Sequence, residues 1–187
     1  MMQSRSATAT VCHLLHGLGV GGAEVLATRL GRQLRGSYRF VYVCLDELGT
    51  LGEGLRDEGF LVHVLGRRSG VDWGCALRLA GVLRRERVDL VHAHQYTPFF
   101  YGAAARVFYP HPSILMTEHG RTFPDYPRRK RMLANRVLLA RRDRVVGVGE
   151  SVRRALIANE GLPARRVGVI YNGIDLSPFA DREDRET

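Results

Sequence analysis

The stretch Gly17-Leu18-Gly19-Val20-Gly21-Gly22-Ala23-Glu24 joins an apolar segment, Thr10–His16, to an amphipathic one, Ala23–Leu34. The first segment is typical of a buried strand and the second of a helix. Glycines at such a turn permit positive φ angles and let the backbone approach a ligand closely, and the N–H groups at the start of the helix can bind an anion. The stretch therefore predicts a phosphate-binding loop.

The same order of strand then helix recurs along the chain. Short runs rich in Val, Leu and Ile, typical of buried parallel strands, occupy residues 10–16, 39–45, 61–65, 88–92, 113–117, 144–148 and 167–170. Amphipathic segments that predict helices occupy residues 23–34, 51–58, 75–84, 99–108, 129–140 and 151–159. This alternation predicts an α/β fold with a doubly wound, Rossmann-like parallel sheet of about seven strands.

Length and composition indicate one domain. The chain has 187 residues, of which 45% are hydrophobic, which is enough for one full core. We place the domain at residues 1–176 and interpret the charged run 177–187 as a tail or the start of an interdomain linker. Cys12, Cys44 and Cys75 are odd in number, widely spaced and set among apolar residues, so we expect buried thiols in a reducing compartment.

In a doubly wound sheet the strand order reverses between the first and fourth strands, and ligands bind at the carboxyl ends of the strands there. The glycine loop leaves the first strand. Polar residues follow the fourth and fifth strands, namely His94, Gln95, Tyr96, Glu118, His119 and Gly120. We expect all of these to line one crevice.

A dinucleotide cofactor is one ligand that the loop could hold. Gly17, Gly19 and Gly22 match the pattern G-x-G-x-x-G, and Asp46 ends the next strand, as in dinucleotide-binding domains. However, Asp46 lies 24 residues beyond Gly22, a long spacing for a ribose-binding acid, and Glu24 would compete with a pyrophosphate in the first helical turn. A stand-alone dinucleotide-binding domain is therefore kept as the alternative interpretation.

Four short motifs together indicate another ligand. They are Gly21-Gly22-Ala23-Glu24, Asp89–His94, Thr117–Gly120, and Val169–Asp175 with Phe179 behind it. In this order and spacing they resemble the N-terminal half of family-4 glycosyltransferases with the GT-B architecture. The resemblance covers almost the whole chain. It implies a domain that contributes to moving a sugar from a nucleotide-sugar donor to a hydroxyl acceptor, with retention at the anomeric carbon and without a metal.

The resemblance also implies roles for individual residues. His119 matches the family histidine that hydrogen-bonds the donor sugar beside the reactive centre, so it is the candidate catalytic residue. Contacts to donor or acceptor are implied for Gly21, Gly22, Glu24, His94, Gln95, Glu118 and Asn172. Gly149 departs from the family pattern, because a hydroxyl residue usually begins that helix, and Ser151 is the alternative cap.

The histidines also allow a metal site to be considered. His92 and His94 share one face of a strand, which is a geometry that could ligate a metal ion. No nearby Asp or Cys completes an obvious ligand set. We therefore predict no metal, and expect neutral imidazoles that hydrogen-bond within the core or to sugar hydroxyls.

The family resemblance implies a second domain. Family members bind the nucleotide-sugar mostly through a C-terminal Rossmann-like domain, which begins shortly after a motif like Asn172-Gly173-Ile174-Asp175. We expect that donor domain, from the same gene or a separate chain, as a partner. No cofactor should bind tightly, and this chain alone should be inactive. A non-catalytic partner module of a split transferase is the other interpretation.

The net charge of +9 is concentrated in one segment. Between residues 121 and 144, Lys130 and several arginines stand against Asp125 and Asp143 alone. The run Arg128, Arg129, Lys130 and Arg131 opens a helix with apolar residues behind it, which suits an anionic membrane surface and an acceptor glycan or glycolipid. Lys130 is the sole lysine and interleaved aromatic residues are missing, so we expect no nucleic-acid binding.

The sequence also bears on location. The N-terminal apolar run is broken by histidines and glycines before it reaches the length of a signal peptide. The longest apolar stretch, 97–109, is too short to cross a bilayer and contains Arg106. We expect a cytoplasmic protein, peripheral at the inner face of the cell membrane.

Overall fold

A computed structural model of the chain describes residues 8–120 and 125–173. Its strands are β1 (Thr10–Gly17), β2 (Arg39–Glu47), β3 (Leu61–Val64), β4 (Leu90–His94), β5 (Ser113–Glu118), β6 (Arg144–Gly147) and β7 (Val167–Val169). Its helices are α1 (Gly22–Gln33), α2 (Thr50–Asp57), α3 (Trp73–Arg85), α4 (Tyr96–Ala105), α5 (Arg129–Leu138), α6 (Glu150–Glu160) and the 3-10 helix η1 (Ala164–Arg166). The proposed boundary at residue 176 and the charged tail lie outside the described residues.

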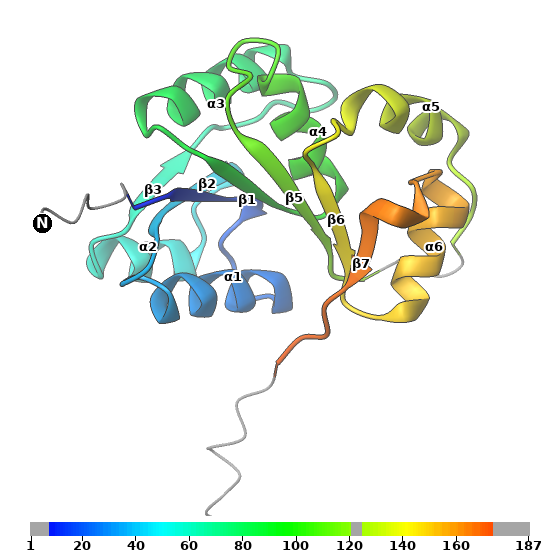
Figure 1. The fold of residues 1–187 in the computed structure, drawn as a ribbon. Coiled ribbons are helices and arrows are strands. Elements are labelled where there is room, and N and C mark those ends of the chain that lie inside the picture. Colours follow the sequence, from blue (N-terminus) through cyan, green and yellow to red (C-terminus); the bar gives the residue numbers. More distant parts are fainter. Residues whose placement is uncertain (1–7, 121–124, 174–187) are drawn as a thin grey trace, which may run out of the picture.

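The strands form one seven-stranded sheet in the order β3-β2-β1-β4-β5-β6-β7. Every neighbouring pair in this sheet is parallel. The order reverses between β1 and β4, so the predicted doubly wound, Rossmann-like sheet is confirmed (Figure 1). The register pairs Val11 with Leu90 and Leu14 with Ala93. The ends of β1, β4 and β5 therefore meet at one edge of the sheet.

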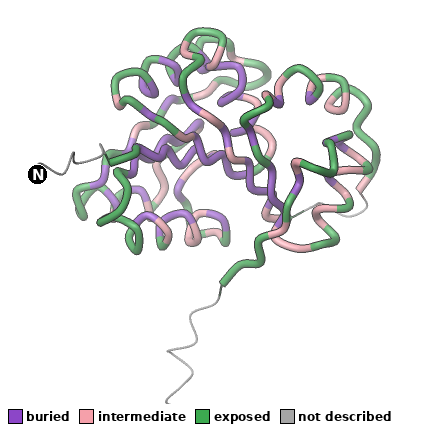
Figure 2. The backbone as a smooth tube through the Cα atoms, viewed as in Figure 1, coloured by how far each residue is buried: buried purple, intermediate pink, exposed green. Residues whose placement is uncertain are grey.

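Both faces of the sheet are covered, which is why its strands are mostly apolar. The larger core cluster packs β1, β2, β4 and β5 against α3 and α4, and includes Leu14, Val43, Leu79 and Phe99. The smaller cluster packs the opposite face against α1 and α2. Figure 2 shows the buried residues concentrated along the central strands. This rigid core holds the loops at the carboxyl edge.

The small features of the fold match several expectations. All three cysteines are buried and free. Gly161 ends α6 with φ 64, the left-handed conformation that glycine adopts readily after the last turn of a helix. Gly149 begins α6 in extended conformation with no side-chain cap, so Ser151 does not take over this role. Within the described residues, no helix is long and apolar enough to cross a membrane.

The fourth strand and its helix differ from the prediction. The strand lies two residues later than expected at its start and contains both His92 and His94. Helix α4 begins at Tyr96 instead of residue 99. Its residues are buried on almost every side, so the hydrophobic periodicity that marks a surface helix does not reveal where it starts.

The turn between β4 and α4 is strained at Gln95. This residue has φ 73 and ψ 174, a region that is essentially restricted to glycine. Its backbone N–H donates to the carbonyl oxygen of Thr117 at 2.8 Å, and its carbonyl accepts from the N–H of Phe99 at 3.3 Å. These bonds to β5 and α4 fix the conformation. Strain of this kind concentrates at functional sites.

We predict that Gln95→Gly is more stable than Gln95→Ala by about 1 kcal/mol in the free energy of unfolding. The glycine variant should therefore unfold at a higher denaturant concentration. Glycine adopts the observed φ without a penalty, whereas alanine keeps the Cβ that causes it. Both substitutions remove the same polar side chain, so urea denaturation of the pair isolates the backbone strain. Equal stability of the two variants would contradict the interpretation.

Candidate functional site

The glycine loop ends at α1 with an open approach to its backbone. A Cβ added at Gly19 or Gly22 would meet no heavy atom within 4 Å. None of these two glycines, Gly17 and Gly21 has a positive φ, so the loop does not use the left-handed conformation that glycine permits. The loop still leaves its backbone open to close approach by a ligand. A side chain at Gly19 or Gly22 would fill this open space.

Glu24 occupies the third position of α1, where a carboxylate interacts favourably with the N-terminal N–H groups. Its side chain folds back over Gly21. Glu24 Oε2 lies so close to Gly21 that a Cβ at this position would collide with it. The carboxylate thus lies in the first turn of α1, where the sequence predicts that it would compete with a pyrophosphate. The space beside Gly22 is open.

The glycine pocket, as we name it, lies against this loop. It is lined by Gly22, Ala23, Glu24, Gln95, His119, Gly120 and Asn172. These residues come from the first turn of α1, the strained β4–α4 turn, the end of β5 and the segment after β7. Five residues predicted from sequence, far apart in the chain, thus meet in one pocket: Gly22, Glu24, Gln95, His119 and Asn172. Gly21 precedes the pocket as the N-cap of α1.

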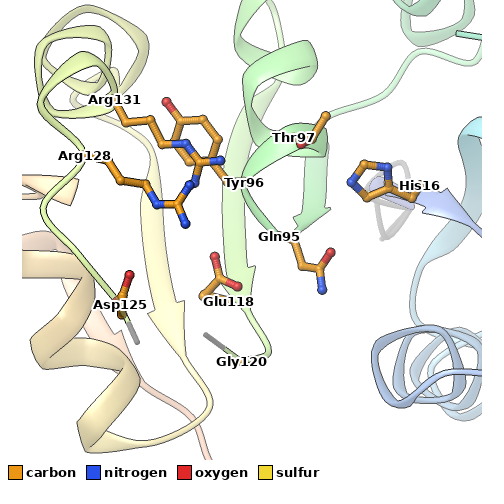
Figure 3. A pocket seen from close by; sticks show the side chains of 9 residues that line it. All are labelled: His16, Gln95, Tyr96, Thr97, Glu118, Gly120, Asp125, Arg128 and Arg131. Carbon is orange, nitrogen blue, oxygen red and sulfur yellow. The ribbon is translucent and has the colours of Figure 1, made fainter. Parts of the chain in front are cut away.

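A second pocket, which we name the arginine pocket, adjoins the first and shares Gln95 and Gly120 with it. Its lining is His16, Gln95, Tyr96, Thr97, Glu118, Gly120, Asp125, Arg128 and Arg131. In Figure 3 the two arginines lie on one side of the pocket, His16 on the other, and Glu118 and Gln95 between them. The lining thus combines cationic, carboxylate, amide and hydroxyl groups.

Arg131 is fixed in the arginine pocket by two contacts. Its guanidinium lies 4.0 Å from the ring centroid of Tyr96, and its Nη1 lies 3.1 Å from Oε1 of the fully buried Glu160. Arg128 approaches the same carboxylate oxygen at 4.0 Å. The cation–π contact and the buried ion pair hold the Arg131 guanidinium in place.

The structure divides the basic run that sequence analysis treated as one surface. Arg128 and Arg131 line the arginine pocket, whereas Arg129 and Lys130 are exposed on α5 outside it. Residues in a helix advance by about 100° each, so neighbours in sequence point in different directions. Proximity in the sequence therefore gave no indication of which arginines belong to the pocket.

Asp46, the candidate ribose-binding acid, is already engaged. Its Oδ2 lies 3.0 Å from His16 Nδ1, and Arg67 donates to both carboxylate oxygens at 2.8 and 3.1 Å. Partial burial pushes the pKa of Asp46 upward, but the hydrogen bonds and charges of Arg67 and His16 outweigh it and lower the pKa. The carboxylate is thus committed to a bidentate ion pair. This disfavours the dinucleotide interpretation.

A row of histidines runs inward from the glycine pocket. His119 Nε2 lies 2.9 Å from His94 Nδ1, and His94 Nε2 lies 2.9 Å from His13 Nδ1. Burial lowers the pKa of His119, and it holds those of His94 and His13 well below the usual value, with neighbouring histidines adding to the effect. His92 packs against His94, with ring centroids 4.3 Å apart, but its Nε2 bonds to the Thr117 hydroxyl at 2.8 Å and not to the row. The row is therefore neutral.

Three of these histidines form a geometric cluster of the kind that could hold a metal. One ring nitrogen from each of His13, His92 and His94 lies within 4.8 Å of the others. However, both nitrogens of His94 are already in hydrogen bonds, and the distance to His13 is that of a direct bond between rings. Metal binding would have to break these bonds. The observed geometry is that of hydrogen-bonded core histidines.

Sequence analysis did not identify His16, Thr97 or Asp125 as site residues. It also did not predict that Arg128 and Arg131 line one pocket together. For His16 a signal existed, since it stands near the carboxyl end of the first strand. The other residues are brought together only when the chain folds, and no local sequence pattern indicates this. Glu118 lines this pocket as the last residue of β5, and His94 is buried behind the glycine pocket instead of lining it.

Comparison with solved structures supports the fold. A glycosyltransferase from Rickettsia africae is 20% identical with a TM-score of 0.76, over 95% of this chain and 46% of that one. Anabaena Alr3699/HepE in complex with UDP-glucose is 19% identical with a TM-score of 0.69, over 89% of this chain and 44% of that one. The lipopolysaccharide outer core galactosyltransferase WaaB is 12% identical with a TM-score of 0.66, over 90% and 47%.

This chain thus spans less than half the length of each of these three proteins. Among curated protein sequences, none matches. The family model for glycosyltransferase family 4 matches residues 20–178, a range that holds both pockets except for His16. That range extends over most of the sheet, and the neighbours share its architecture. The chain belongs to glycosyltransferase family 4 as an N-terminal, GT-B-type Rossmann-like domain.

Proposed function

We propose that this chain is the acceptor-side domain of a glycosyltransferase that moves a sugar from a nucleotide-sugar to a hydroxyl acceptor. The observation that carries the proposal is the contact between the two pockets, which share Gln95 and Gly120 at the carboxyl edge of β1, β4 and β5. The glycine pocket receives the sugar and diphosphate of the donor. The arginine pocket receives the acceptor, whose hydroxyl reaches the donor sugar at the shared wall.

The glycine pocket offers two groups to the donor. The backbone beside Gly22 is open, and the N-terminus of α1 provides N–H groups that stabilise negative charge on the leaving diphosphate. His119 lies across the same pocket and is neutral, because burial lowers its pKa. A neutral imidazole hydrogen-bonds a sugar hydroxyl. We further propose retention at the anomeric carbon and metal-independent chemistry, because the resemblance to family-4 glycosyltransferases implies both.

The nucleotide is bound by a second, C-terminal domain. The length of the neighbours supports this assignment, since each of them is about twice the span that this chain matches, and one is a complex with UDP-glucose. The domain is supplied by the same gene or by a separate chain. No tightly bound cofactor is required, and the donor domain completes the active enzyme.

The arginine pocket suits a polyhydroxylated acceptor. Glu118, Gln95 and Thr97 offer hydrogen-bonding oxygen and amide groups, and Arg131 adds donors in a fixed position over Tyr96. Sites built from a few well-placed polar groups of this kind recognise hydroxyl-rich ligands by the geometry of their hydrogen bonds. The acceptor is thus a glycan or the carbohydrate portion of a glycolipid.

One face of α5 suits contact with an anionic membrane. At about 100° per residue, Arg129, Lys130, Leu133, Arg136 and Val137 fall within one third of the helix circumference. All five are exposed, and the apolar Leu133 and Val137 are 66% and 84% exposed. Basic and apolar side chains on one exposed face favour the headgroup region of a bilayer with acidic lipids. We therefore propose a lipid-linked acceptor reached from the inner face of the cell membrane.

The donor-site assignment predicts the effect of two substitutions in the enzyme completed by its C-terminal domain. His119→Ala should lower kcat about 100-fold, because a hydrogen bond to the reacting sugar is lost. Gly22→Val should raise KM for the nucleotide-sugar, because its side chain fills the open approach. Steady-state kinetics with varied donor measures both.

The matched control for the glycine substitution is Gly81→Val. Gly81 lies in α3, also with open space around it, and outside both pockets. This variant should keep the donor KM of the wild type. Turnover at the wild-type rate in both His119→Ala and Gly22→Val would show that the donor does not bind in the glycine pocket.

The membrane assignment predicts that the chain sediments with vesicles containing phosphatidylserine. Changing Arg129 and Lys130 together to Gln should weaken this binding roughly 30-fold, at about 1 kcal/mol per basic residue. A control that changes Arg29 and Arg68, two exposed arginines away from α5, removes the same charge and should bind as the wild type. Equal losses in both double variants would indicate nonspecific charge attraction, and no binding by the wild type would refute the assignment.

A further inference from the structure

We propose that His16 binds the acceptor, by accepting a hydrogen bond at Nε2 from one of the acceptor's hydroxyl groups. Asp46 and Arg67 act as positioning residues that hold the His16 ring in the form that can accept this bond. The contact with the acceptor rests on the arginine pocket as the acceptor site, as proposed above. The form of the ring is a property of this chain and can be measured without a substrate.

His16 lies next to the end of β1, at an irregularity in the pairing of β1 with β2. The register shifts between Leu15 and Gly17. His16 therefore lies opposite two residues of β2, Leu45 and Asp46. Irregularities of this kind change the direction in which a side chain points and are common next to functional sites. Here the Asp46 carboxylate reaches the His16 ring.

The bond to Asp46 determines which nitrogen of His16 carries the proton. Asp46 Oδ2 lies 3.0 Å from His16 Nδ1. Partial burial raises the pKa of Asp46, but hydrogen bonds from Arg67 and His16 and the charges of both lower it below its usual value. The carboxylate is therefore ionised at neutral pH. An ionised carboxylate only accepts hydrogen bonds, so Nδ1 is the donor and carries the proton.

Arg67 supplies the counter-charge of Asp46. It donates to both carboxylate oxygens, at 2.8 and 3.1 Å. Its own position is fixed, because its backbone N–H donates to the carbonyl of Leu45 at 2.7 Å and its guanidinium lies 5.7 Å from the ring centroid of Tyr101. The guanidinium charge opposes a second positive charge on the nearby His16 ring. The ring is therefore neutral, with its one proton on Nδ1 and none on Nε2.

The bare Nε2 is available to a ligand in the arginine pocket. Figure 3 shows the His16 ring pointing into this pocket, on the side of Gln95 and Thr97. The side chain is 39% exposed, and within residues 8–120 and 125–173 its Nε2 has no hydrogen-bond partner. Arg131, on the far side of the pocket, offers only donors. A sugar suits both sides, because each hydroxyl both accepts and donates, whereas a fully ionised phosphate has no proton for Nε2.

Nuclear magnetic resonance of the chain labelled with 15N-histidine tests the form of the ring. At about pH 8, where imidazoles are mostly uncharged, we expect His16 to have a protonated Nδ1 and a bare Nε2. Asp46→Asn introduces an amide that can donate to Nδ1, so the proton should move to Nε2. A bare Nδ1 in the wild type, or a ring protonated on both nitrogens, would overturn the proposal. A proton that stays on Nδ1 in Asp46→Asn would contradict the positioning role of Asp46.

The matched control for this variant is Asp89→Asn. Asp89 Oδ1 lies 3.3 Å from His111 Nε2, in an exposed pair that lines neither the arginine pocket nor the glycine pocket. It removes the same charge from another carboxylate next to a histidine. The control should therefore leave the His16 nitrogens as they are in the wild type.

Titration with methyl α-D-glucopyranoside, an uncharged and hydroxyl-rich probe, tests the contact. We expect the His16 Nε2 resonance to move together with the backbone amides of Gln95 and Thr97, because all three line the pocket. Amide shifts in the pocket without a change at His16 Nε2 would overturn the proposal. No change at any residue of the pocket would instead refute the acceptor site proposed above, while leaving the measured form of the ring in place.

The enzyme completed by its C-terminal domain links the contact to turnover, with octyl β-D-glucopyranoside as the acceptor. His16→Asn keeps an amide near the position of Nδ1 but has no atom at that of Nε2, so it should raise KM for this acceptor about tenfold and leave the donor KM unchanged. His16→Gln should recover most of the loss, because its amide oxygen can accept near the position of Nε2. The control His111→Asn should leave both KM values unchanged. An unchanged acceptor KM in His16→Asn, or a raised donor KM, would contradict the proposal.

Discussion

The parallel pairing of β1 with β4 is the constraint on which the rest of this site depends. It brings together two segments that are distant in the chain and reverses the direction in which the sheet is built. As a result the glycine loop after β1 and the strained turn at Gln95 after β4 open onto the same edge. It also sets His13 on β1 beside β4, where its ring bonds to His94, the next member of the row of histidines. The positions of both pockets and of the row of histidines thus follow from the pairing of β1 with β4.

The surrounding core allows polar and strained groups to be held at this edge. Gln95 keeps a glycine-like backbone conformation because its peptide groups are bonded to β5 and α4. Glu160 stays buried as a partner of Arg131, which in turn lies over Tyr96. Buried groups of this kind are costly when unpaired. Their pairing fixes the walls of the arginine pocket before any ligand arrives, which favours selective recognition of a polar ligand.

Neighbouring residues of the same basic run lie on different surfaces. On α5 the helical repeat turns Arg131 toward the buried Glu160 and exposes Arg129 with Leu133 and Val137. One helix therefore contributes to a polar pocket on one side and to an amphipathic surface on another. In the proposed enzyme this arrangement would place the acceptor pocket close to the membrane that holds a lipid-linked acceptor.

Sequence patterns predicted the fold class, the strands that meet at the crevice and most residues of the glycine pocket, including Gly22 and His119. These follow from local patterns, because buried parallel strands are apolar and loops at a switch point lie together. Tertiary structure alone decided that Arg131 enters a pocket, that Asp46 is held by Arg67, and that His13 reaches His119 through His94. Each depends on side-chain contacts between residues remote in sequence, which no local periodicity encodes.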